Sequence, residues 1–121
     1  MSEIKQIEPN KWEEFLEAFS ERNKNRRARF QLFRGASAEE EAQEAHLETV
    51  SVKDNGDKTD VVVVRTDLSN AAAEKLRDII TNVRGIAVQY DTDGSEDILE
   101  IADEENELVI LRLESKVDGA S

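Results

Sequence analysis

The sequence predicts an α+β fold, with a mainly antiparallel sheet of five or six strands and two helices packed on one face of it. Three observations lead to this prediction. Two segments repeat apolar residues at helical spacing, several others alternate like strands, and Asn-Gly and Asp-Gly pairs separate some of those strands. The 121 residues fit a single domain, 1–121, for which we expect an ordered core over 8–114 and a frayed tail over 115–121.

The first helix is expected from Pro9 to Arg22. Proline suits the first turn of a helix, because the N–H that it lacks would have no partner there. Trp12, Phe15, Leu16 and Phe19 follow at i, i+3, i+4 and i+7, which places them on one apolar stripe. We therefore expect Trp12 to be buried in the core.

Three strands are expected next. In the first, Arg27 to Arg34, alternation puts Arg27, Arg29 and Phe33 on one face and the apolar Ala28, Phe30 and Leu32 on the other. The segment from Ser37 to Ala45 is rich in Ala and Glu and is interpreted as a short helical turn or a mobile loop. Leu47 to Lys53 and Asp60 to Thr66 then flank Asn55-Gly56, a strong hairpin signal.

The second helix is expected from Asn70 to Val83, followed by three more strands. One strand starts near Ile86, Asp93-Gly94 turns the chain, and Ile98 to Ala102 pairs with Leu108 to Leu113. The order is thus helix, three strands, helix, three strands. One interpretation is a duplication of a helix-three-strand unit, and the other is the ordinary alternation of an α+β domain.

Composition excludes several classes of function. The chain has no cysteine and one histidine, His46, so disulfides, thiolate chemistry and a zinc site lack their ligands. No apolar run approaches the roughly 18 residues of a membrane span. We expect a cytoplasmic protein with no cofactor, no metal and no membrane partner. The net charge of −12 opposes general adhesion to nucleic acid.

The N-terminal stretch from Ile7 to Ser20 resembles a family of small bacterial proteins of unknown function that open with I-P-x-x-E-W-x-x-F-L-x-x-F-S. Trp12, Phe15, Leu16, Phe19 and Ser20 match this motif at the right spacing. Glu8 is an insertion, Lys11 replaces the acidic residue, and Asn23-Lys24-Asn25 stands where the family has His-x-Gly. The C-terminal runs 98–101 and 111–113 also look like the family's ending. The resemblance implies a bacterial protein and assigns no activity.

The main candidate site is a basic run over residues 22–34, which holds six positive charges and no acidic residue. The candidate binding residues are Arg22, Lys24, Arg26, Arg27, Arg29, Phe33 and Arg34. Arginines interleaved with aromatic residues can bind phosphates or nucleic acid around Arg27 and Arg29, or an acidic protein. The structural alternative is that these arginines pair with acidic residues of the same chain or protect an edge strand.

A second candidate is the acidic turn from Asp91 to Glu100, which partly matches a calcium-binding EF-hand loop. Its flanks look like strands rather than helices, so a hairpin turn explains the same residues. A carboxylate-based enzyme is the remaining alternative, although no catalytic constellation is recognisable. The sequence thus favours a non-enzymatic module, monomer or homodimer, that binds another macromolecule.

Overall fold

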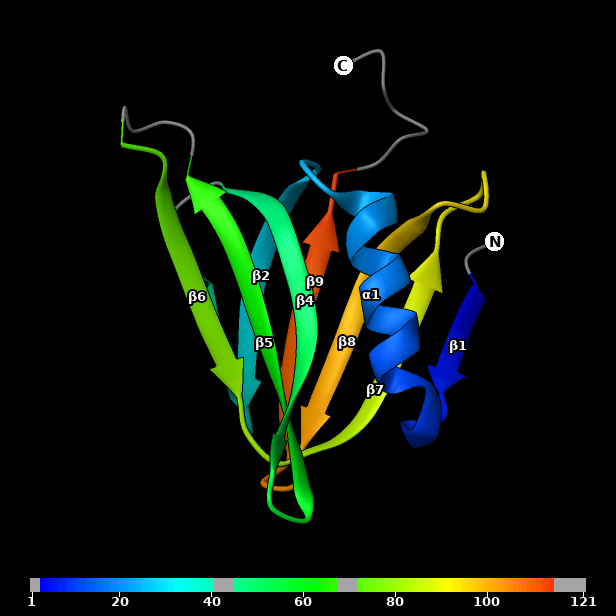
Figure 1. Cartoon of the computed structure of the whole chain (residues 1–121), viewed down its shortest axis with the longest axis vertical. Helices are drawn as coiled ribbons and strands as arrows, with labels where there is room; N and C mark the ends of the chain where they lie inside the picture. Colours follow the sequence, from blue (N-terminus) through cyan, green and yellow to red (C-terminus); the bar gives the residue numbers. More distant parts are fainter. Residues whose placement is uncertain (1–2, 41–44, 68–71, 115–121) are drawn as a thin grey trace.

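Antiparallel strand pairing dominates the structure (Figure 1). The computed structural model describes residues 3–40, 45–67 and 72–114. Within these ranges the chain forms one nine-stranded sheet, the 3-10 turn η1 (Pro9–Lys11) and one α-helix, α1 (Trp12–Asn23). The strands are β1 (Glu3–Ile7), β2 (Arg27–Arg34), β3 (Ser37–Glu40), β4 (Ala45–Asn55), β5 (Lys58–Asp67), β6 (Glu74–Ile80), β7 (Val83–Tyr90), β8 (Glu96–Asp103) and β9 (Glu107–Leu113).

The strand order is β1-β7-β8-β9-β2-β4-β5-β6, and β3 pairs with β2 off this path. Among the described residues the β2–β4 pairing consists of two residue pairs, Arg27 with His46 and Ala28 with Ala45. Toward its C-terminal end β4 diverges from β2, and α1 packs against this part of β4. In Figure 1 the helix lies in front of the sheet, between β4 and β1.

One face of the sheet and α1 enclose the core. We call this the inner face and the opposite side the outer face. Trp12 is 6% exposed, which confirms its expected burial, and its Nε1 donates a 3.0 Å hydrogen bond to the carbonyl of Ile7. Leu16 and Phe19 are fully buried beside it. The strands contribute residues of alternating positions, among them Ala28, Phe30, Val50, Val61, Val63, Ile86, Val88, Leu99, Ile101, Val109 and Leu111.

The α+β prediction with two helices on one face is wrong, because the expected second helix from Asn70 to Val83 does not form where the structure describes it. Residues 74–80 form β6, and β7 begins at Val83. The positive φ of Asn82 turns the chain between them. Every residue of β6 pairs with β5, so sheet hydrogen bonding overrides the apolar spacing. Ile79, which a helical stripe would bury, is 50% exposed.

The predicted strand number is wrong as well. β1 was not expected, and Ser37–Glu40 forms β3 rather than a helical turn or loop; residues 41–44 lie outside the described ranges. The helix-three-strand duplication is also wrong, since the second unit has no helix in its described part. The expected tail over 115–121 lies outside the described residues.

Several local predictions are confirmed. The Asn55-Gly56 turn joins β4 to β5, with Gly56 at a φ of 69° that glycine adopts without strain. The hairpin of β8 and β9 turns at Asn106, which also has a positive φ. No helix in the described ranges is long and apolar enough to cross a membrane.

Candidate binding site

The basic run does not form one surface, because it spans the end of α1, a turn and a strand. Within β2, alternate side chains point to opposite faces of the sheet. Arg27 and Arg29 lie on the outer face. Arg34 is an even number of residues from the buried Ala28 and Phe30, so it lies with them on the inner face. The structure therefore separates the predicted site residues into three places.

The first place is the C-terminal end of α1, where Arg22 binds the buried carboxylate of Glu96 and Arg26 binds the backbone carbonyl of the same residue. Arg22 donates two hydrogen bonds to Glu96, at 2.9 and 2.7 Å, and Asn23 donates a third at 2.9 Å. The hydrogen bond to Glu96 raises the pKa of Arg22, and burial lowers the pKa of Arg26. Arg26 donates to Asn23 and to the carbonyls of Glu96 and Glu114. These two arginines thus tie α1 to β8 and the end of β9.

The second place is the far end of β2. Arg34 pairs with Glu107 of β9 at 2.6 Å, an ion pair that joins two neighbouring strands. Lys24, just after α1, is exposed. For Arg22, Arg26 and Arg34, contacts within the chain account for the positive charge, as the structural alternative expects.

The third place is the outer face of β2 and β9, where an arginine cluster forms from Arg27, Arg29 and Arg112. Arg29 lies directly opposite Arg112 in the β2–β9 pairing, so their Cβ atoms are about 5 Å apart. Arg27 lies two residues before Arg29 on the same face, and all three residues are exposed. Arg29 is 59% exposed, and Glu40 reaches it only at 4.0 Å. Like charges directly opposite each other destabilise a sheet, so this pairing is not explained by stability.

Aromatic side chains do not surround the arginine cluster. Trp12, Phe19 and Phe30 are buried in the core, and Phe15 packs partly against it. Phe33 is half-buried on the outer face, where its pairing partner is Leu108, farther along the strands from the cluster. The described part of the face therefore offers cations without a row of exposed rings on which bases could stack.

The acidic turn is a hairpin connection between β7 and β8. Asp91 accepts a hydrogen bond from the N–H of Thr92, and Asp93 accepts hydrogen bonds from the N–H and hydroxyl of Ser95. Glu96 binds Arg22, as described above. No group of three or more metal-ligating side chains occurs among the described residues.

Sequence reasoning missed two residues of these sites. Arg112 stands alone in an apolar strand, and only the register of β9 against β2 brings it to Arg29. Glu96 lies in an acidic turn that resembles any solvated loop, although it is 6% exposed. One signal in the sequence could have found Arg112. It lies between Leu111 and Leu113 in a strand, and this alternation predicts that its side chain points away from the core.

Comparison with known proteins found no matching family model, no matching curated protein and no matching solved structure. The resemblance to the bacterial family of unknown function stays a prediction.

Proposed function

We propose that this chain is a non-enzymatic binding module that holds an acidic segment of another protein on its outer sheet face, through Arg27, Arg29 and Arg112. The observation that carries the proposal is the direct opposition of Arg29 and Arg112 across β2 and β9. Two guanidinium groups in this arrangement repel each other in the free protein and can bind one carboxylate or neighbouring carboxylates jointly. The repulsion is relieved when an anion binds.

An acidic protein segment fits this face better than nucleic acid does. Proteins that bind single-stranded nucleic acid combine a positively charged groove with aromatic side chains on which bases stack, and the described outer face near the cluster offers only Phe33, which is half-buried and lies farther along β2. The net charge of −12 also repels a long polyanion more strongly than a short acidic segment. The proposal includes a cytoplasmic location, with which the absence of cysteine agrees.

The test measures binding of a fluorescent glutamate-rich peptide by anisotropy, at low and at physiological salt. We expect binding that weakens with salt and is lost when Arg29→Glu and Arg112→Glu are combined. Arg77→Glu is the matched control, because Arg77 is an exposed arginine on β6, away from the cluster. Equal loss in the control would contradict the proposal, and tighter binding of a single-stranded oligonucleotide at the same arginines would favour nucleic acid.

A further inference from the structure

Apolar side chains follow the arginine cluster along the outer face of β2 and β9. Beyond the cluster the outward cross-strand pairs are Gln31 with Ile110 and then Phe33 with Leu108. Phe33, Leu108 and Ile110 are half-buried, and we call them the outer apolar strip. The face therefore changes from cationic to apolar over four residues of β9, a distance of about 13 Å.

No helix in the described part of the chain covers the outer apolar strip. Helix α1 packs against β4 on the inner side, where Leu16 and Phe19 are fully buried. On the outer face Ala102 lies directly opposite Leu108, and Gly85 lies opposite Ala102. A Cβ atom added at Gly85 would meet no atom within 4 Å. The strip is thus bordered by small residues and open space, which leave room for another element.

Charge is distributed unevenly around the strip. Arg112 forms no ion pair with a described residue, and the carboxylate that reaches Arg29 is that of Glu40, at 4.0 Å. Glu100 borders the strip opposite Ile110, and Gln89 donates a 2.6 Å hydrogen bond to it. One end of the strip therefore carries two arginines that lack close carboxylate partners, and this end favours an acidic group of a partner.

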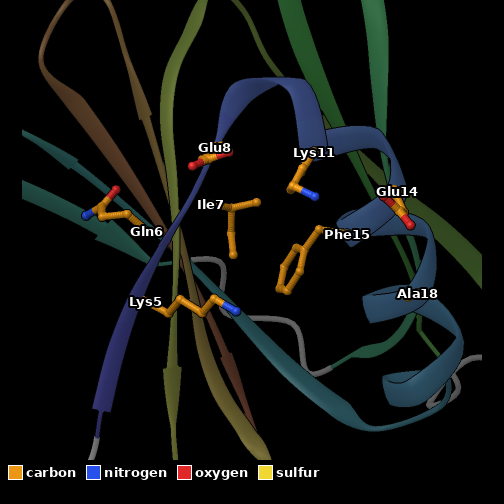
Figure 2. A pocket seen from close by; sticks show the side chains of 8 residues that line it. All are labelled: Lys5, Gln6, Ile7, Glu8, Lys11, Glu14, Phe15 and Ala18. Carbon is orange, nitrogen blue, oxygen red and sulfur yellow. The ribbon is translucent and has the colours of Figure 1, made fainter.

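The hollow between β1 and α1 offers no such selection (Figure 2). Its volume is about 440 Å³. Lys5 and Lys11 line it together with Glu8 and Glu14, so its lining charges cancel and favour neither an acidic nor a basic partner. Of these two surfaces, the outer apolar strip is therefore the one whose charge selects an occupant.

A segment that lies on the outer face must satisfy its own backbone groups. Strand β9 is paired on both sides, with β2 and with β8, and β2 is paired with β9 along nearly its whole length. These pairings use the backbone groups in the plane of the sheet, so the face itself presents side chains. A helix meets this condition because it bonds its backbone internally, and helices commonly cover the apolar face of a sheet.

We propose that the partner segment held by the arginine cluster is an amphipathic helix, whose carboxylates bind the cluster and whose apolar side packs on the outer apolar strip. This inference rests on the proposed function and adds the conformation and the apolar half of the partner. A helix rises 1.5 Å per residue, so the distance of about 13 Å from Arg112 to Leu108 corresponds to about nine residues. The acidic and the apolar contacts should therefore come from opposite halves of the helix.

A second copy of the chain is not the expected occupant. Its described part contains one α-helix, and the apolar side of that helix is already buried through Trp12, Leu16 and Phe19. An anionic membrane is disfavoured by the net charge of −12. The partner is therefore expected to be a different protein.

The probe is a fluorescent, stapled helical peptide of about 15 residues, long enough to span the cluster and the strip. One half carries glutamates, and the other carries leucines that share one side of the helix. A peptide of the same composition in scrambled order is the control, because its leucines do not share a side. We expect the first peptide to bind about tenfold more tightly in anisotropy titrations, since it alone buries leucine side chains on the strip.

Variants of the strip separate its role from that of the arginines. Leu108→Thr combined with Ile110→Thr should remove the preference for the helical peptide and leave binding of the scrambled peptide unchanged. Threonine retains the preference for a strand. Val64→Thr is the matched control, because Val64 is half-buried on β5 and pairs with Thr49 and Arg77, away from β9. Phe33→Thr is a second, milder variant, and thermal melting verifies that each variant folds.

The outcomes distinguish this inference from the proposed function. Equal binding of the two peptides, with loss of both when Arg29→Glu and Arg112→Glu are combined, would overturn the inference alone. Binding of neither peptide would overturn both. A preference that survives in the strip variants would also overturn the inference. So would tighter binding of phosphatidylserine vesicles, or a concentration-dependent dimer in sedimentation that the strip variants dissociate, because a membrane or a second copy would then cover the strip.

Discussion

Ser20 of α1 and Val50 of β4 are joined through both backbone groups of Val50. The Ser20 hydroxyl accepts a hydrogen bond from the Val50 N–H at 2.8 Å, and lies 3.0 Å from the Val50 carbonyl, to which it can donate. The same hydroxyl lies 2.8 Å from the carbonyl of Leu16. Val50 belongs to the part of β4 that no longer pairs with β2, so one helix side chain satisfies groups that a neighbouring strand would otherwise bond.

Replacing Ser20 with alanine should lower the free energy of unfolding by about 1–3 kcal/mol, because the Val50 N–H would be buried without an acceptor. Urea denaturation measures this change, and hydrogen exchange at Val50 should accelerate more than elsewhere. Ser51→Ala is the control, since Ser51 is the next residue and is exposed. Equal effects of the two substitutions would contradict the role of Ser20.

Trp12→Ala should cost about 3–5 kcal/mol, the usual range when a large aromatic residue is removed from a core. Trp12→Phe should cost less, because it retains much of the buried surface and loses the hydrogen bond to Ile7. Thermal and urea unfolding measure both variants. A Trp12→Ala protein with an unchanged melting midpoint would show that the indole does not stabilise the core.

Arg112→Gln should stabilise the protein by about 0.2–1 kcal/mol, because it removes one of two like charges directly opposite each other. The gain should be larger at low salt, where screening is weaker. Melting temperatures at several salt concentrations measure it. If the variant is less stable than the parent at low salt, Arg112 is paired within the chain and the arginine cluster loses its main support.

The stability of the protein should fall at acidic pH in a manner that depends partly on Glu48. Hydrogen bonding to Lys75 is the main cause that lowers the pKa of Glu48, and Thr66 contributes a second hydrogen bond. A carboxyl whose folded pKa is lowered stabilises the fold above its unfolded pKa of about 4.3, and the stabilisation is lost as pH falls through the folded value. Glu48→Gln should therefore unfold with a weaker dependence on pH below that point. An identical dependence in both proteins would exclude this contribution.

The sequence predicted elements wherever local signals sufficed. The stripe of Trp12, Leu16 and Phe19 located α1, and Asn55-Gly56 located the hairpin of β4 and β5, because both signals act within a few residues. The prediction of a helix over β6 was wrong because the apolar residues of this segment fit two patterns. They satisfy a helical spacing and, through Leu76 and Ile80, also a strand alternation. Pairing with β5 decides between them, and such pairing is not encoded within the segment itself.

The candidate site could be predicted only in part for the same reason. Alternation placed Arg27 and Arg29 on one face of a strand, and the structure agrees. The separation of Arg34 from them also follows from alternation, but its contact with Glu107 requires the register of β9. The burial of Glu96 depends on Arg22 and Asn23 of α1, more than seventy residues away in the chain.

The position of α1 along β4 has a consequence for aggregation. Beyond Leu47 the edge of β4 that faces away from β5 is shielded by the helix rather than by a strand. A fluctuation that detaches α1 would unmask this edge while the β4–β5 hairpin stays intact, and unmasked strand edges recruit other chains. The helix therefore protects the folded chain against edge-to-edge polymerisation, and substitutions that loosen its packing should first appear as loss of colloidal solubility.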